Sequence, residues 1–321
     1  MKASKAFRMR IFLAGACVLV LAGPVARGEE GKGAGAVKVD RERRRIEVPA
    51  MSLEQGKYEE QLKGAIEYVL VSKGGKSYES LFETAVPPEE IARAFAQLSI
   101  PPGRMGESEK PPRGAAFRIT IERQAEGKTE TKPVESYILH AKTGKALEEE
   151  PWVYTGSVLH RDPGRDAVGL KCVTTGSIAG LHFHDDSPLL LNRRKEAWTQ
   201  NIYKAAREAL PPPGTSVVVV FEHIPGTAPK DARGAHAVIS GRVQGLGVPT
   251  FAQREAKMLS LGGFVRSLAD GRIEVAVEGP PDGVATFLKK LEQGPRGARP
   301  EKVDTRDVAP LGIYDGFEIE K

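Results

Sequence analysis

The chain has 321 residues, with 47 lysines and arginines against 42 acidic residues and a formal net charge of +5. The first 28 residues hold five of these basic residues and no acid, so the rest of the chain carries 42 of each sign. The basic character therefore belongs to the N-terminal segment, and the remaining chain gives no support to nucleic-acid binding.

Residues 1–28 have the pattern of a secretory signal peptide. Basic residues open the segment, a run of thirteen apolar residues begins at Ile11, and Ala26-Arg27-Gly28 offers a cleavage site before Glu29. Thirteen apolar residues are too few to span a bilayer, which needs about twenty. We expect an exported protein, periplasmic or extracellular, with no transmembrane span after cleavage. An uncleaved anchor and lipid attachment at Cys17 are the alternatives, although Cys17 lies inside the apolar run that a lipid-modified cysteine should end.

The chain after cleavage keeps one cysteine, Cys172, which has no partner for an intramolecular disulfide. The apolar alternation around it predicts a strand over Leu170–Val173, with the thiol as a small buried apolar group. A nucleophilic thiol would need a neighbouring base, and the sequence points to none.

Residues 29–37 are glycine-rich, and we expect them to be disordered. A larger domain then covers residues 38–224, and its fold class is predicted as α+β with strands in excess. Its expected strands are Ile46–Val48, Ile66–Val71, Phe117–Ile121, Val134–Leu139, Val153–Val158, Leu170–Val173 and Val217–Phe221. One helix is predicted from Pro87 to Leu98, with acids at its start and Ile91, Phe95 and Leu98 on one face. A second is predicted over Glu196–Leu210.

Three places in this domain are candidate sites. His182 and His184 alternate on a strand and precede two acids, which suits a metal; the alternative is a polar strand end followed by a turn. Lys76, Ser77 and Glu79 lie in a glycine-flanked loop, where the alternative is a hairpin with polar decoration. Trp152 and Tyr154 alternate with Val153, which predicts one core face and one face for contact.

A linker is predicted at residues 225–235, because proline and glycine recur there without an apolar period. The domain that follows, residues 236–321, should begin with a strand over Ala235–Val243 and a helix over Thr250–Leu261. A hairpin should turn at Asp270-Gly271 between Phe264–Val265 and Ile273–Val277. A second helix should bury Val284, Phe287, Leu288 and Leu291, and strands should follow at Val303–Val308 and Phe317–Ile319.

The most informative stretch is Ile239 to Pro249, where a β-branched run enters a glycine-rich bend before a helix. Such a bend presents backbone N–H groups and a helix N-terminus, which together form an anion cradle. The cradle residues would be Gln244, Gly245, Leu246, Gly247 and Val248. A tight turn without a ligand is the alternative.

With the later phrases Gly263-Phe264-Val265-Arg266-Ser267 and Gly271-Arg272-Ile273, this stretch closely resembles the acylphosphatase family. The resemblance covers roughly His236 to Lys321 and implies a ferredoxin-like βαββαβ domain that hydrolyses carboxyl–phosphate anhydrides without a metal. The arginine that clamps the phosphate in that family is replaced here by Pro249, and the asparagine that orients the water by Ser267. Neither family catalytic residue is intact.

The larger domain resembles the YdjY-like domain of exported bacterial proteins, a family that implies no activity. The phrases that carry the resemblance are Ile46-Glu47-Val48-Pro49-Ala50, Tyr68-Val69-Leu70-Val71, Gly74 to Leu81, Pro151 to Ser157 and Leu210 to Thr215.

Two functions follow as hypotheses. The first is an exported, non-catalytic protein whose degenerate acylphosphatase-like domain binds a small anion or a partner protein. The second is an acylphosphatase in which a relocated arginine (Arg242, Arg254 or Arg266, with Arg254 the foremost) replaces the missing clamp. Neither hypothesis calls for a cofactor or for nucleic acid.

Overall fold

The computed structural model describes residues 35–54, 64–106, 111–162, 167–182, 186–226, 231–314 and 316–320. The proposed leader with Cys17 lies outside these ranges, as does His184. No helix within them is both long enough and apolar enough to cross a membrane.

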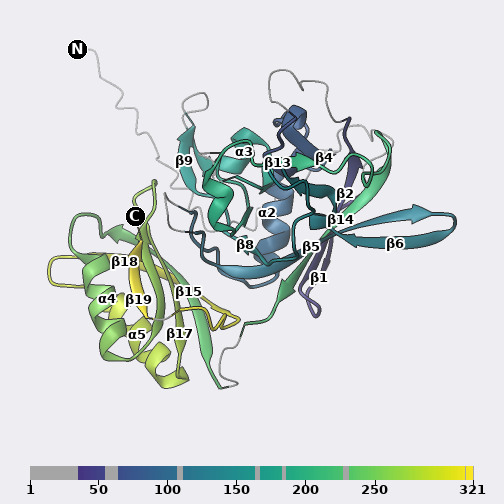
Figure 1. Cartoon of the computed structure of the whole chain (residues 1–321). Coiled ribbons are helices and arrows are strands. Elements are labelled where there is room, and N and C mark those ends of the chain that lie inside the picture. The colour runs from purple at the N-terminus through teal and green to yellow at the C-terminus, as the bar shows by residue number, and fades with distance from the viewer. Residues whose placement is uncertain are drawn as a thin grey trace, which may run out of the picture. The chain divides into compact units, whose positions relative to one another are not determined.

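The N-terminal domain is built on a large, mostly antiparallel sheet (Figure 1). β4 pairs with β3 at one end of the strand order and also with β2, so that the path of strands closes on itself. β6 extends β5 as a hairpin arm. In sheet order the strands are β1 (Lys38–Asp40), β2 (Arg45–Ser52), β14 (Ser216–Ile224), β5 (Ala115–Ala125), β8 (Trp152–Tyr154), β12 (Leu190–Asn192), β11 (Ser177–Gly180), β3 (Tyr68–Ser72) and β4 (Ser80–Thr84), with β6 (Lys128–Pro133) at the side.

Helix α2 (Pro88–Gln97) anchors this core, as its sequence pattern predicts. Ile91 and Phe95 are fully buried, and the ring of Phe95 stacks on Tyr154 at 4.7 Å between centroids. Phe117 of β5 and Phe221 of β14 also contact the ring of Phe95. One apolar helix face therefore joins three strands that are distant in sequence.

Several expected elements of this domain were wrong. Residues 196–210 form a short η3 (Lys195–Trp198) and a strand, β13 (Tyr203–Ala205), which pairs with β7 (Ile138–His140) instead of continuing a helix. Cross-strand backbone hydrogen bonds and burial of Tyr203 outweigh local helix propensity here. The expected strand over Val134–Leu139 is mostly a 3-10 turn, η2 (Val134–Tyr137).

The segment around Cys172 also differs from expectation. β10 (Ala167–Leu170) pairs with β9 (Leu159–Asp162) and ends before Cys172, which lies on the short helix α3 (Lys171–Thr175). The thiol is buried, as expected, and its burial raises the pKa of Cys172 to about 12. All three residues of β8 are buried, so the contact face proposed for Trp152–Tyr154 is core instead.

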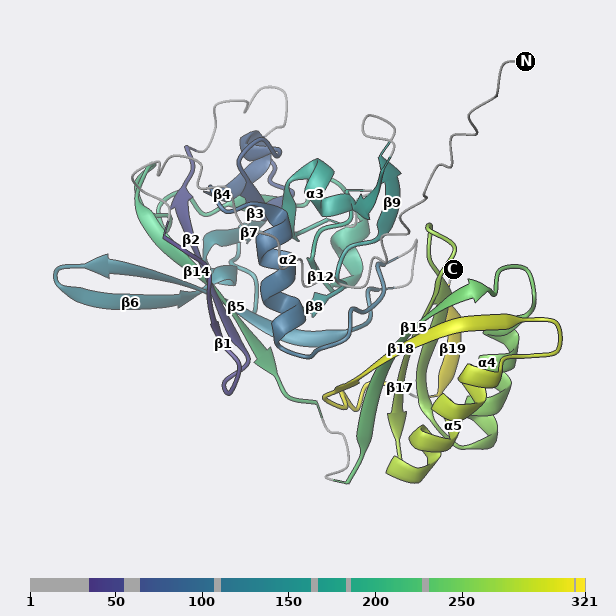
Figure 2. The ribbon, with the colours of Figure 1, turned by 180° about the vertical axis from the view of Figure 1, so that it is seen from behind.

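The C-terminal domain is a five-stranded sheet with two helices on one face (Figures 1 and 2). The sheet order is β18 (Arg299–Val308), β15 (Arg233–Arg242), β17 (Ile273–Gly279), β16 (Gly262–Ser267) and β19 (Phe317–Glu320). Neighbours are antiparallel except β16 and β19. The helices are α4 (Val248–Met258) and α5 (Pro281–Gln293), which gives the expected βαββαβ, ferredoxin-like order.

The apolar periods of this domain predict its core well. Val284, Phe287, Leu288 and Leu291 of α5 are all buried, and they pack on alternate residues of β15 and β17. On α4, Ala252 and Ala256 are buried, whereas Phe251 and Leu259 are half-buried, and the helix begins two residues earlier than expected. Gly271 has φ +91°, a left-handed conformation that suits glycine in the hairpin turn.

Candidate functional site

The glycine-rich turn between β15 and α4 is the candidate site. Gly245 and Gly247 have φ of +68° and +72°, and a Cβ on either would meet nothing within 4 Å. Backbone conformation, not crowding, therefore accounts for glycine at both positions. Gln244, Gly245 and Gly247 are exposed, while Val243 and Val248 on either side are buried and fix the ends of the turn.

Gly247 caps helix α4, and Pro249 is the second residue of that helix. The first intrahelical bond runs from the amide of Phe251 to the carbonyl of Gly247 at 2.9 Å. The amides of the first turn have no intrahelical acceptor, and proline removes one of them. Gly247, Val248 and Thr250 still supply backbone donors at the start of the helix. The position tolerates proline because no helical hydrogen bond is lost there.

Ser267, which the sequence predicts at the second family position, ends β16 and is exposed. It lies opposite Ile273 in the β16–β17 hairpin, whose turn reaches the glycine-rich bend. The side chain of Gln244 lies over Gly271, where a Cβ would sit 3.6 Å from its amide carbon. The fold thus brings the bend and the hairpin turn after Ser267 together, although twenty-odd residues separate them in the chain.

Arg254, the foremost candidate for a relocated clamp, is held along the side of α4. Its guanidinium donates to Glu255 from Nε at 3.2 Å and from Nη2 at 2.9 Å, and lies 5.5 Å from the ring centre of Phe251. The side chain is 65% exposed. Lys290 of α5 donates to the same carboxylate, and the hydrogen bonds from Lys290 and Arg254 lower the pKa of Glu255.

Of the other two arginines, Arg266 also lies away from a clamping position. Arg266 is inside the molecule, where its Nε donates to Glu274 at 2.7 Å with only 13% of the side chain exposed. Arg242 ends β15, exposed and opposite Arg299 of β18. The guanidinium of Arg254 is therefore hydrogen-bonded to Glu255, and that of Arg266 to Glu274.

The histidine pair gives no metal site in the part of the chain that the structure describes. His182 is buried, and its Nε2 lies 3.0 Å from the carbonyl of Trp198. His184 falls outside the described residues, and within them no group of three potential ligands comes together.

The loop around Lys76 gathers partners that the sequence did not connect. Lys76 Nζ lies 3.1 Å from Asp186 and 3.5 Å from Glu79, and Tyr68 donates a hydrogen bond to the same aspartate. Burial alone would lower the pKa of Lys76, but the hydrogen bond and charge of Asp186 outweigh it and raise that pKa. Burial and Asp186 also raise the pKa of the Tyr68 hydroxyl, which therefore stays protonated. Only the pairing of β3 with β4 and β11 makes these residues neighbours, so spacing alone did not reveal the group.

Comparison with known proteins assigns both domains. The family model described as YdjY domain matches residues 37–222, which is more than half of the chain. The chain belongs to the YdjY domain family. The model described as acylphosphatase matches residues 235–319, which confirms the acylphosphatase resemblance and the ferredoxin-like fold there.

Two curated relatives match the acylphosphatase-like part of this YdjY-family chain. The acylphosphatase of Thermus thermophilus is 49% identical over 83 residues, covering 26% of this chain and 93% of the relative. That of Pseudomonas paraeruginosa is 42% identical over 86 residues, 27% of this chain and 93% of the relative. Among solved structures, the acylphosphatase of Bacillus subtilis is 28% identical and covers 28% of this chain and 99% of its own, with a TM-score of 0.27.

Proposed function

We propose that this protein is exported and non-catalytic, and that its C-terminal domain is a degenerate acylphosphatase that binds a small anion or a partner protein through the bend at residues 244–248. The observation that carries the proposal is Pro249 at the second position of α4, where the acylphosphatase family has its arginine. An arginine offers a charged, planar fork that matches a phosphate bidentately, and proline offers neither charge nor donor.

The size of the expected loss in reaction rate supports binding without turnover. Removing one preorganised donor to a developing charge costs about 100- to 1000-fold in rate, and the whole cationic fork should cost at least that. The backbone donors of Gly247, Val248 and Thr250 remain, and they suffice to hold an anion weakly at a helix N-terminus. Ser267 keeps a hydroxyl but not the amide that would orient a water molecule.

The competing function is an acylphosphatase that still hydrolyses acyl phosphates. The 49% identity to the Thermus thermophilus acylphosphatase favours it. It needs a substitute cation, and the foremost candidate, Arg254, is engaged by Glu255 along α4. An exported enzyme would also meet few acyl phosphates, which are cytoplasmic metabolites.

Hydrolysis of a simple aryl acyl phosphate separates the two functions. We expect the wild type to be inactive, and Pro249→Arg/Ser267→Asn to gain at least about 100-fold over it. Arg254→Ala is the matched control. If Arg254 served as the clamp, this change would abolish whatever activity the wild type shows. Turnover by the wild type near the rate of an intact acylphosphatase would overturn the proposal.

Binding is tested separately by NMR titration with inorganic phosphate, followed at the amides of residues 244–250. Saturable shifts confined to these amides in the wild type support the anion cradle. Shifts spread evenly over the surface, or none at millimolar phosphate, would leave a partner protein as the ligand class. Mass spectrometry of the N-terminus of the secreted protein tests the export proposal, with Glu29 as the expected first residue.

A further inference from the structure

Part of the C-terminal sheet face that carries no helix is buried, which a bare sheet face in water would not be. Along β17, Ile273, Val275 and Val277 pack under the helices, so Glu274 and Ala276 point to the other side. Yet Glu274 is 6% exposed and Ala276 1%. The docking face, as we define it, consists of these two residues with their neighbours on β15 and β16, His236, Phe264 and Arg266, all of them buried or nearly so.

A segment of the N-terminal domain supplies the cover. Arg266 donates from Nη1 to the carbonyl of Gly103 at 2.8 Å, and the amide of Ala309 donates to the carbonyl of Ser99 at 3.2 Å. Arg113 pairs with Glu318 of β19 at 2.9 Å. Arg266 of the docking face, together with Ala309 and Glu318 beside it, is thus hydrogen-bonded to Gly103, Ser99 and Arg113.

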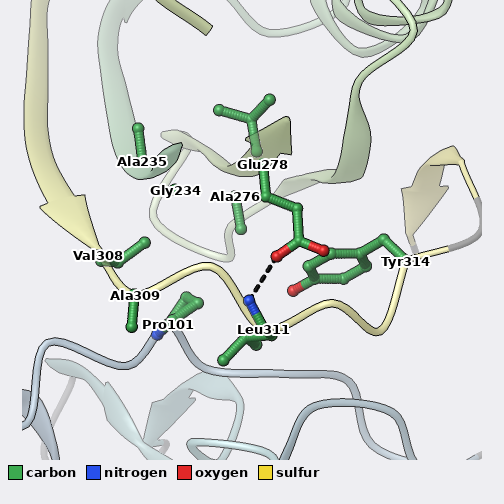
Figure 3. A pocket seen from close by; sticks show the side chains of 10 residues that line it. Pro101, Gly234, Ala235, Ala276, Glu278, Val308, Ala309, Leu311 and Tyr314 are labelled. Atoms are coloured by element: carbon green, nitrogen blue, oxygen red, sulfur yellow. Dashed lines mark hydrogen bonds between the residues drawn. The ribbon is translucent and has the colours of Figure 1, made fainter. Parts of the chain in front are cut away.

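The apolar contacts follow the same pattern. Leu311, in the loop after β18, packs into the core cluster of the N-terminal domain. Figure 3 shows what holds that loop in place. Glu278 of β17 accepts a hydrogen bond from the amide of Leu311 at 2.5 Å, and Pro101 lines the same small depression. The depression they line has no room for a water molecule, so the contact there is dry.

A buried ionic cluster lies at the centre of the docking face. The carboxylate of Glu274 is 2.7 Å from both His236 Nε2 and Arg266 Nε, and Arg266 is 3.5 Å from Glu320. Buried charges are costly unless their partners and hydrogen bonds are complete. The carbonyl of Gly103 accepts a hydrogen bond from Arg266, so the N-terminal domain satisfies one more donor of this cluster.

We propose that the helix-free face of the acylphosphatase-like sheet is a docking surface for residues 99–104 and Arg113 of the YdjY domain. The two domains then form one rigid unit whose register is set by the Arg266–Glu274–His236 cluster. This inference is independent of whether the bend at residues 244–248 binds an anion or retains activity. It also excludes the helix-free face as a site for an external partner.

Cross-linking in the full chain tests the docking. In a Cys17→Ser background the buried Cys172 is the one native thiol. Ser99→Cys/Ala309→Cys should oxidise at a rate independent of protein concentration, as expected for thiols held side by side, with a bridged peptide found by mass spectrometry. Ser99→Cys/Met258→Cys is the matched control, because Met258 is 61% exposed on the helix side of the sheet, and it should stay reduced.

A second, zero-length cross-link guards against unfavourable cysteine geometry. Arg113→Lys treated with a carbodiimide should become joined to Glu318, and Arg113→Lys/Glu318→Gln should not. Either specific cross-link supports the docking. Absence of both, in variants that keep the circular dichroism of the wild type, overturns it.

Discussion

The two faces of the C-terminal sheet use the same strands and bury opposite chemistry. Under α4 and α5 the inward residues are aliphatic and aromatic, such as Val275 and Phe287. One residue along the same strand, Glu274 lies in an ionic cluster that is also largely buried. The comparison shows that buried residues need not be apolar. The helices cover one face of the sheet with apolar side chains, which need no hydrogen-bond partners. A loop whose backbone carbonyls can accept hydrogen bonds covers the other face.

The largest effect should come from the helix-covered face. Phe287 is fully buried and meets Phe317 at 5.5 Å between ring centres, so Phe287→Ala removes an aromatic side chain and leaves a cavity. We expect a loss of about 3–5 kcal/mol in the free energy of unfolding, measured by urea denaturation. Met258→Ala, on the exposed side of α4, should change it by less than about 0.5 kcal/mol. Equal effects would contradict the assigned core.

On the charged face, Glu274→Gln should lower the free energy of unfolding by about 3 kcal/mol, because it leaves Arg266 and His236 around a neutral group. Burial by itself would raise the pKa of Glu274, but Arg266 and His236 outweigh it and lower that pKa to about 2. A carboxyl with a lowered folded pKa stabilises above its unfolded pKa, near 4.3, and loses that effect as pH falls toward 2. The difference between wild type and variant, measured by denaturation at several pH values, should therefore shrink from pH 5 to pH 2. A constant difference would show that the charge of Glu274 is not what stabilises this face.

Glu320, at the edge of the same cluster, should behave in the opposite way. Burial raises the pKa of its carboxyl, with Arg266 opposing, so protonation of Glu320 favours the folded state. Its stabilising effect is complete below its unfolded pKa and is lost as pH rises through the folded value. Glu320→Gln mimics the protonated form, and at pH 7 we expect it to stay within about 1 kcal/mol of the wild type or to be more stable. A loss as large as that of Glu274→Gln would mean that Glu320 is an obligatory partner of Arg266.

The smallest effect belongs to Arg254→Ala on the surface of α4. Exposed ion pairs contribute about 0–1 kcal/mol, and Glu255 keeps Lys290 as a partner after the change. The midpoint temperature of thermal unfolding should change little. A large drop would place Arg254 in a structural role that its 65% exposure does not suggest.

Local signals in the sequence determined most of the C-terminal domain. The 3.6-residue apolar period of α5, the Asp270-Gly271 turn and the glycine-rich bend each depend on residues that are near one another in the chain. The sequence also predicts that Pro249 and Ser267 stand at the two catalytic positions of the acylphosphatase family, and this stays a prediction. The same reasoning failed over residues 196–210, where a helical composition forms a strand because β7 offers a pairing edge.

Tertiary structure alone decided what the charged residues do. Nothing in the spacing of Arg254 and Arg266 says that the first binds Glu255 beside it while the second pairs with Glu274 and Glu320 inside the molecule. Likewise, Lys76 meets Asp186 only through the pairing of strands that lie far apart in the chain. Periodicity records which side of an element is apolar, because that depends on near neighbours. The partner of a charge depends on which distant segment is folded against it.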